Sequence, residues 1–355
     1  MVIFDVRREI ERECKGVNII MPNILITQYC VRSCPYCFAK KHMSESSPTD
    51  ILSWEDLIYL ADFLWASGER KFRILGGEPT LHPEFNNMVL YLLERGFDIT
   101  VFTSGIMADS KLLEAEFLFR DLPPERLNFM CNTNDPQRTH TPLAEQESIK
   151  RFFRAFGNKV SLGLNVYKLD FSMDFLVQYI NEFGLQRHIR VGIAHPIPGK
   201  KNLFLPLDAI DRVIERLFSY APLLDRFRVK TTLDCGFPLC RISNDQLGWI
   251  QRVTGGQTRF GCNPVIDIGP DMSVWPCFPL SDFHKKSIYD FNSMREVIDF
   301  YQKYHDVVRI EAGGIFGACD ECTFREEHIC SGGCIAHCVS RFQNEAPIRM
   351  KDVYL

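Results

Sequence analysis

Three cysteines in one short segment are the residues of this chain whose type and spacing point most directly to chemistry. Cys30, Cys34 and Cys37 stand four and three residues apart, directly after the apolar residues 23–26. Thiolates bind soft metals and iron–sulfur clusters, and four of them usually hold a four-iron cluster. Three thiolates would leave one iron open to a small molecule. A structural zinc site, with His42 as a fourth ligand, is the alternative.

A second candidate is formed by two glycines, an acidic residue and a proline, namely Gly76, Gly77, Glu78 and Pro79. This motif follows the apolar residues 72–75, about forty residues after the cysteines. Alone it is weak, because many loops that follow strands carry glycines. Two motifs in this order, each at the end of a predicted strand, favour an iron–sulfur cluster over zinc.

Together the two motifs, with Tyr36 before the third cysteine, resemble the radical S-adenosylmethionine (SAM) superfamily. The resemblance implies that Cys30, Cys34 and Cys37 hold a [4Fe–4S] cluster whose open iron binds the amino and carboxylate groups of SAM. It implies that residues 76–79 hold the methionine amino group and that Tyr36 lies near the adenine. The implied chemistry is cleavage of SAM to a 5'-deoxyadenosyl radical, which abstracts hydrogen from an unactivated carbon.

Strand-like and helix-like segments alternate from residue 23 to about residue 234. Apolar runs that predict strands lie at residues 23–27, 72–75, 99–103, 127–132, 160–166 and 189–194. Amphipathic segments that fit helices lie at residues 54–66, 85–94, 148–156, 173–183 and 207–220. The repeat predicts an α/β fold with a parallel sheet, either doubly wound or curled into a partial barrel. The family resemblance implies a partial (β/α)6 barrel.

Polar residues at the ends of three further strands are weaker candidates for binding SAM, because ligands of parallel sheets bind at the carboxyl ends of the strands. Ser104 stands in Thr-Ser-Gly, which resembles the superfamily's Thr-Asn-Gly, and Asn132 and Asn165 end the fourth and fifth predicted strands. The resemblance implies contacts of these side chains with SAM. Satisfying the backbone of a loop explains them equally well.

Nine of the fourteen cysteines crowd the last third of the chain. The seven from Cys262 onward resemble the SPASM extension of radical SAM enzymes, which carries two auxiliary iron–sulfur clusters and would bring the total to three [4Fe–4S] clusters. The resemblance implies that the first auxiliary cluster is held by Cys262, Cys277 and Cys334, with Cys240 or Cys235. It implies that the second is held by Cys319, Cys322, Cys330 and Cys338. A pair of zinc ribbons is the alternative.

The predicted organisation has four parts: an N-terminal extension (1–22), a radical SAM partial barrel (23–234), a cysteine-rich auxiliary-cluster domain (235–345) and a tail (346–355). A formal net charge of −4 argues against nucleic acid as a partner. No apolar run reaches the roughly 20 residues of a membrane span. The start lacks a secretory pattern, so we expect a cytoplasmic protein whose cysteines bind metal.

These features favour oxidative modification of a C–H bond, most of all in a ribosomally made peptide, as a crosslink or dehydrogenation. The alternatives are oxidation or rearrangement of a small molecule, such as a sugar or amino acid, and a non-catalytic electron carrier. An external donor of the flavodoxin or ferredoxin type is expected. A peptide substrate would be recognised through a separate recognition protein or without one, because only about 20 residues precede the first strand. Asp234, Asp267 and Asp320 are candidate bases.

Overall fold

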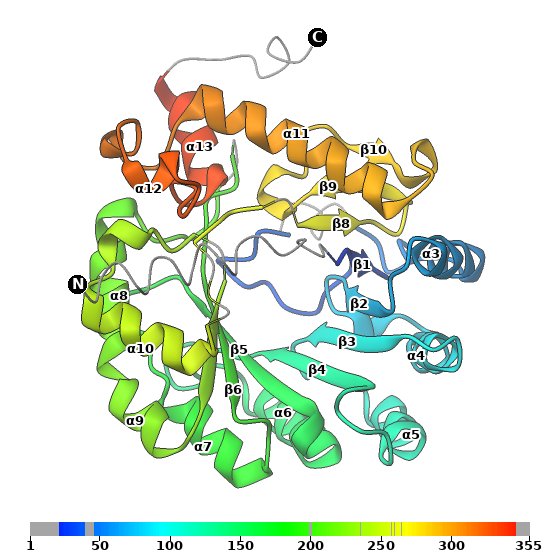
Figure 1. Ribbon diagram of the computed structural model, residues 1–355. Helices are drawn as coiled ribbons and strands as arrows, with labels where there is room; N and C mark the ends of the chain where they lie inside the picture. Colours follow the sequence, from blue (N-terminus) through cyan, green and yellow to red (C-terminus); the bar gives the residue numbers. More distant parts are fainter. Residues whose placement is uncertain are drawn as a thin grey trace.

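A single ten-stranded sheet organises the described part of the chain, in the order β10-β9-β8-β1-β2-β3-β4-β5-β6-β7. The computed structural model describes residues 21–39, 46–198, 201–234, 236–256, 258, 260–263 and 265–345. His42 and Cys235, two of the predicted ligands, lie outside the described residues. The sheet curves into an open barrel with helices on its outer side (Figure 1).

The barrel part of the sheet confirms the predicted partial barrel and has seven parallel strands, one more than predicted. Its strands are β1 (Asn23–Leu25), β2 (Lys71–Leu75), β3 (Asp98–Thr103), β4 (Leu127–Asn132), β5 (Val160–Val166), β6 (His188–Ile193) and β7 (Lys230–Leu233). The covering helices are α3 (Trp54–Ala66), α4 (Phe85–Glu94), α5 (Asp109–Phe119), α6 (Leu143–Phe156), α7 (Asp174–Phe183), α8 (Ile210–Ser219), α9 (Ala221–Arg226) and α10 (Asn244–Thr254). The sequence pattern did not predict α5, α9, α10 or β7.

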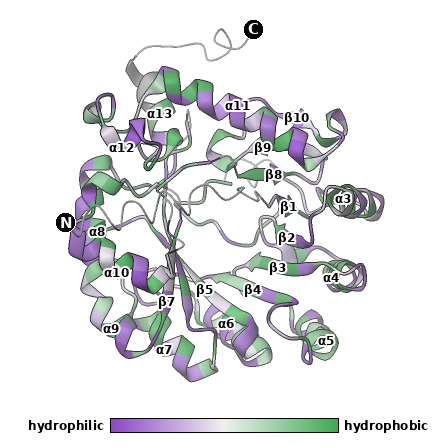
Figure 2. Cartoon of the chain, viewed as in Figure 1, coloured by the Kyte–Doolittle hydropathy of each residue, from purple (hydrophilic) through white to green (hydrophobic). Residues whose placement is uncertain are grey.

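Local sequence explains why these helices form and which side they bury. The Ser53 hydroxyl caps α3 by accepting a hydrogen bond from the backbone N–H of Asp56. Leu57, Leu60 and Leu64 are spaced along one side of that helix and are fully buried against the sheet. Both hydrophobic and hydrophilic residues are visible on the outer helices in Figure 2. Among the described residues, none of the helices is both long and apolar enough to cross a membrane.

The strands bury one face more completely than the other. In β2, Phe72 and Ile74 are fully buried, whereas Arg73 between them is half-buried. In β3, Ile99 and Val101 are buried and their neighbours are half-buried. Successive residues of a strand point to opposite faces. The face covered by helices is therefore apolar, and the inner face of the barrel has room for polar groups.

The C-terminal third extends the same sheet across the boundary predicted at residue 234. Strand β8 (Ile266–Ile268) pairs with β1 in parallel, and β9 (Ser273–Pro276) and β10 (Lys286–Ser287) continue the sheet antiparallel. Helices α11 (Met294–Ala312), α12 (Thr323–Glu326) and α13 (Ile335–Glu345) follow. The division into domains at residue 234 stays a prediction, because the sheet itself runs through that point.

The segments that follow β1 and β2 lie against each other, backbone to backbone. The N–H of Gly77 donates to the carbonyl of Thr27 at 2.9 Å, and the N–H of Glu78 donates to that of Tyr29 at 2.9 Å. A Cβ atom on Gly76 would lie 2.6 Å from the Thr27 oxygen, and one on Gly77 would lie 2.3 Å from the Tyr29 oxygen. Only glycines permit this approach, so the pair fixes where the cysteine-bearing segment leaves the sheet.

We expect Gly77→Ala to destabilise the fold by at least about 2 kcal/mol, because a backbone oxygen stands where the new methyl group must go. Chemical denaturation followed by circular dichroism measures the change. Gly248→Ala is the matched control: it lies in α10 with nothing within 4 Å of a new Cβ, and alanine favours a helix. A Gly77→Ala protein as stable as the parent would contradict the close approach.

A buried carboxyl group joins β8 to β1 at the amino end of β1. The side-chain amide of Asn23 donates to Oδ1 of Asp267 at 2.7 Å, and both residues are buried. Burial raises the pKa of Asp267 to about 7, although the hydrogen bond from Asn23 opposes the shift. Between about pH 4 and pH 7 the folded state then binds more protons than the unfolded state, so stability falls as pH rises through this window.

We therefore expect Asp267→Asn to raise the free energy of unfolding at pH 8, since the variant keeps an acceptor for Asn23 without a charge. The pKa difference corresponds to an effect on the order of 4 kcal/mol at pH 8 and little at pH 4. Thermal unfolding under anaerobic conditions at both pH values measures it. Asp121→Asn serves as the control, because that side chain is 93% exposed. A parent and variant with parallel pH profiles would disprove the raised pKa.

Candidate active site

The three cysteines of the first motif lie in the segment that follows β1, at the carboxyl edge of the parallel sheet. Cys30, Cys34 and Cys37 are all half-buried. The backbone N–H of Arg32 donates to Sγ of Cys30 at 3.4 Å, and the N–H of Cys37 donates to the carbonyl of Cys34 at 3.1 Å. The segment thus turns tightly on itself and carries three soft sulfur donors.

Burial disfavours the thiolate forms of Cys30 and Cys34 when no cation is bound. It raises the pKa of Cys30 to about 11, with smaller increases from Glu78 and Cys34, while the hydrogen bond from Arg32 opposes the shift. Burial also raises the pKa of Cys34, and the charge of Arg32 opposes it. A thiolate here needs a cationic partner such as iron. The three sulfur donors fit a [4Fe–4S] cluster with one open iron. Among the described residues, no group of three or more Cys, His, Asp or Glu side chains is arranged to bind a single metal ion.

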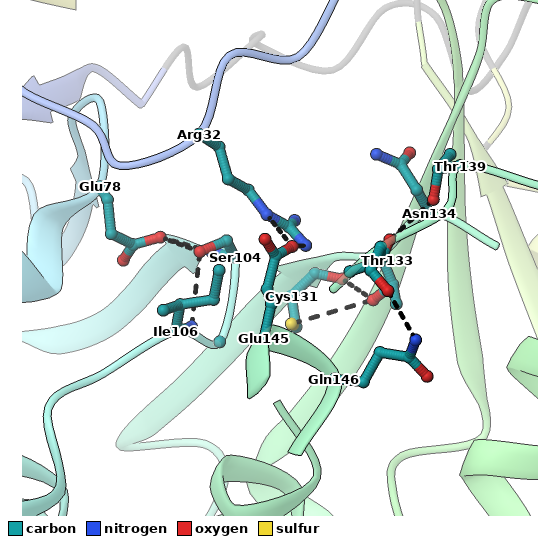
Figure 3. Close-up of polar contacts among 12 residues, drawn as sticks. Arg32, Glu78, Ser104, Ile106, Cys131, Thr133, Asn134, Thr139, Glu145 and Gln146 are labelled. Atoms are coloured by element: carbon teal, nitrogen blue, oxygen red, sulfur yellow. Dashed lines mark hydrogen bonds and ion pairs between the residues drawn. The ribbon is translucent and has the colours of Figure 1, made fainter. Parts of the chain in front are cut away.

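Glu78 of the second motif has its carboxylate saturated by the protein. Oε1 accepts from the hydroxyl groups of Thr103 at 2.7 Å and Thr80 at 2.9 Å. Oε2 accepts from the backbone N–H and the hydroxyl of Ser104 at 2.7 and 2.5 Å. Figure 3 shows this contact beside Ile106, whose N–H donates to the same hydroxyl. The carboxylate therefore positions the segments after β2 and β3. The hydroxyl group of Ser104 donates its hydrogen bond to this carboxylate.

Tyr36 fastens the cysteine segment to the ends of β4 and β5. Its hydroxyl donates to Oδ1 of Asn134 at 2.9 Å, and its ring stacks on Tyr167 with centroids 4.7 Å apart. Burial raises the pKa of Tyr36, and hydrogen bonds with Asn134 and Asn165 oppose the shift. Asn165, predicted to bind SAM, thus lies beside Tyr36. The expected contact of Tyr36 with adenine stays a prediction.

An ion pair that the sequence analysis missed holds the same segment from the other side. Arg32, between the first two cysteines, donates to Oε1 of Glu145 through Nε at 2.6 Å and through Nη2. Glu145 lies in the first turn of α6 (Figure 3). The two residues are 113 positions apart, so the sequence offered no pattern to connect them. The pair places a guanidinium group close to the thiol of Cys34.

Charged and polar side chains occupy the inner face of the barrel. Arg190 on β6 donates to Oδ1 of Asp234 at 3.0 Å and to Oδ1 of Asn132 at 3.3 Å. A Cβ on Gly163 would lie 2.5 Å from the Asn132 oxygen, and one on Gly192 would lie 2.9 Å from the Asp234 carboxylate. Glycines on β5 and β6 thus make room for these groups. Asn132 is engaged by Arg190, and its predicted contact with SAM is untested.

Arg73 on β2 faces the same space and has no partner in the part of the chain that the structure describes. Within the described residues it forms no hydrogen bond and no ion pair. Burial lowers its pKa, the charge of Arg190 lowers it further, and Asp234 opposes the shift. Two guanidinium groups and one carboxylate therefore act on each other across the barrel. An arginine within an otherwise apolar strand was the sequence signal for this group.

The three candidate bases lie in different places. Asp234 follows β7 at the carboxyl edge of the sheet, on the side of Arg190. Asp267 pairs with Asn23 at the amino end of β1, opposite the edge where the cysteines lie, and its role as a base stays a prediction. Asp320 is 70% exposed and pairs with Arg325. Of the three, Asp234 is the one that reaches the polar interior.

The C-terminal cysteines fall into two neighbourhoods. A hydrogen bond with Cys334 and burial raise the pKa of Cys262 well above its usual value. The N–H of Cys277 donates to the carbonyl of Val265 at 2.6 Å, three residues after Cys262. The other neighbourhood contains Cys319, Cys322 and Cys330, which surround the short helix α12. These sulfur sets also fit iron–sulfur clusters in donor chemistry.

Comparison with known proteins agrees with the first motif and the fold. Residues 24–183 match the sequence profile of the radical SAM superfamily. The mitochondrial GTP 3',8-cyclase of Arabidopsis thaliana is 22% identical over 205 residues, which are 57% of this chain and 50% of that protein. An S-adenosylmethionine-dependent nucleotide dehydratase of Selenomonas ruminantium is 35% identical over 96 residues, which are 26% of this chain and 33% of that protein. This chain thus spans half or less of these two relatives.

Two solved structures share most of the fold. Native anSMEcpe with bound AdoMet gives a TM-score of 0.63 at 18% identity, covering 88% of both chains. SuiB of Streptococcus suis bound to the precursor peptide SuiA gives 0.57 at 15% identity, covering 83% of this chain and 68% of that one. At such identities the likeness concerns the fold. The profile match, the cysteine and glycine motifs within it, and the partial barrel together identify a radical SAM domain over residues 24–183 of this chain.

Proposed function

We propose that this chain is a radical SAM oxidoreductase that modifies a C–H bond of a ribosomally made peptide, as a crosslink or a dehydrogenation. The observation that carries the proposal is the pairing of the cysteine segment with the Gly76–Glu78 backbone at the carboxyl edge of the sheet. That pairing puts a three-thiolate set beside the motif that the superfamily uses for the methionine end of SAM.

When bound, the [4Fe–4S] cluster and SAM supply a 5'-deoxyadenosyl radical, at the cost of one electron from an external flavodoxin- or ferredoxin-type donor. A substrate that gives up one hydrogen atom to the radical must lose one more electron and one proton to complete a two-electron oxidation. Two auxiliary clusters on the C-terminal cysteines would accept this second electron. Asp234, at the mouth of the polar interior, is our candidate to take the proton.

The peptide substrate is supported by the fold shared with SuiB, which was solved bound to its precursor peptide, and by the cysteine-rich C-terminal third. A peptide needs access to the carboxyl edge of the barrel, where exposed apolar side chains are available for contact. Val31 beside the first cysteine is 52% exposed, and Leu203, whose N–H donates to the Pro35 carbonyl, is 50% exposed.

A small anionic molecule is the second candidate, and the inner face of the barrel favours it. Arg73 has no partner within the described residues and shares its space with Arg190. A half-buried guanidinium group gains most from a ligand that brings a negative charge. The two named relatives are a GTP cyclase and a nucleotide dehydratase, whose names specify anionic molecules.

We expect the anaerobically reconstituted parent to convert SAM to 5'-deoxyadenosine and Cys34→Ala to lose at least about 100-fold of that rate, because the cluster loses one of its three thiolates. Chromatography of 5'-deoxyadenosine measures it. Cys131→Ala is the control: this buried cysteine on β4 lies outside the cysteine segment and should keep the parent rate. A fully iron-loaded parent that does not cleave SAM would contradict the proposal.

Arg73→Met separates the two substrate classes. If the substrate is a small anion, the SAM-loaded parent should bind GTP, used as the probe, and the variant should bind it at least about tenfold more weakly, since a charged hydrogen bond is worth about 1.5–3 kcal/mol. Calorimetric titration measures the affinity. Arg70→Met is the control, because Arg70 stacks on Trp65 at the start of the strand. A parent that binds neither GTP nor inorganic triphosphate would leave the peptide as the proposal.

A further inference from the structure

The C-terminal cysteines of the second neighbourhood pack around glycines that leave space for sulfur. A Cβ on Gly314 would lie 2.5 Å from Sγ of Cys319, so that position must be glycine. Sγ of Cys319 also lies 3.8 Å from where a Cβ of Gly332 would be. The N–H of Gly332 donates to Sγ of Cys330 at 3.4 Å. Cys319 and Cys330 therefore approach each other through one glycine-lined turn.

Arg241, the residue after Cys240, contacts this turn from the end of the barrel. Cys240 lies in the short 3-10 helix Leu239–Arg241, which follows β7. The guanidinium group of Arg241 lies 4.3 Å above the ring of Phe316, three residues before Cys319, and also pairs with Asp211 of α8. The cation–π contact joins the barrel to the cysteine-rich turn.

The cysteines of the same turn are the electrostatic neighbours of Cys240. Cys330 lies close enough to the thiol of Cys240 to act on it electrostatically, and Cys319 and Cys322 act on it more weakly. Four sulfur donors thus act on one another from three separate segments of the chain. Cys240 itself is the exposed member of the group.

The remaining cysteines form their own set around helix α13. Cys334 and Cys338 are four residues apart in one helical stretch, which puts their side chains on the same side. The thiol of Cys338 donates to the carbonyl of Cys334 at 3.8 Å, and Cys334 is the hydrogen-bond partner of Cys262. With Cys277 next to residue 265, these four gather on the side of α13 and β9.

We propose that Cys240, Cys319, Cys322 and Cys330 are the four ligands of the second auxiliary iron–sulfur cluster, and that Cys338 belongs with Cys262, Cys277 and Cys334. This inference rests on the auxiliary clusters of the proposed function and exchanges two of their ligands. The assignment from sequence placed Cys240 with Cys262 because spacing along the chain does not reveal that Arg241 folds against Phe316. In the exchanged arrangement, the second cluster ties the end of the barrel to the C-terminal extension.

Loss of iron in paired variants tests which cysteines share a cluster. The full-length parent, reconstituted anaerobically, should hold about twelve irons, and Cys240→Ala and Cys319→Ala should each lose up to about four. The double variant Cys240→Ala/Cys319→Ala should lose no more than the greater single loss. The double variant Cys240→Ala/Cys262→Ala should lose about eight. Additive loss for the first pair, or a shared loss for the second, would overturn the proposal.

A measurement on the parent alone covers the case in which variants fail to fold. Cys240 is exposed in this structure, so iodoacetamide should alkylate it in iron-free protein and spare it after reconstitution, as mass spectrometry of the peptides would show. Alkylation of Cys240 in fully loaded protein would refute its role. A parent that cleaves SAM with only about four irons would instead remove the auxiliary clusters from the proposed function, and this inference with them.

Discussion

The buried carboxylate of Glu78 is the constraint on which the arrangement of the site depends. A carboxylate without water is tolerated only when hydrogen bonds compensate for its lost hydration. Here Thr80, Thr103 and Ser104 provide them, and the backbone N–H of Glu78 holds Tyr29. One residue, through its side chain and its backbone, therefore fixes the exits of β1, β2 and β3 relative to each other. These hydrogen bonds of Glu78 therefore also fix the position of the three cysteines that follow β1.

The barrel separates two environments through the alternation of its strands. Outward residues such as Phe72 and Ile99 are fully buried under helices. The inward residues include Arg190, which is satisfied by Asp234, and Arg73, which has no partner within the described residues. A cation left in this state makes the interior more receptive to a ligand that carries negative charge. The apolar shell supplies stability, while the interior holds a guanidinium group that is unpaired among the described residues.

Local signals in the sequence were sufficient for the motifs, the parallel sheet, and both ends of α3 and α4, while the choice of a partial barrel came from the family resemblance. They failed where the apolar residues of an element are not the buried ones. Helix α5 leaves Leu113 and Phe117 exposed, so its apolar periodicity is weak. Strand β7 is short and rich in threonine, so it lacks an apolar run. The sequence also gave no sign of contacts between distant segments. The pairing of Arg32 with Glu145 and the parallel pairing of β8 with β1 join residues more than a hundred positions apart, which no local pattern encodes.

The place of β1 between β2 and β8 has a consequence for how the molecule is assembled. On the ribosome, β1 emerges first, gains β2 within some fifty residues, and keeps an open edge until residues 266–268 are made. Parallel pairing over such a separation is slow, and open strand edges invite wrong partners. The cysteine segment thus follows a strand whose second neighbour is made 244 positions later. A nascent chain stopped before residue 266 would carry that segment on a sheet in which one edge of β1 is still open.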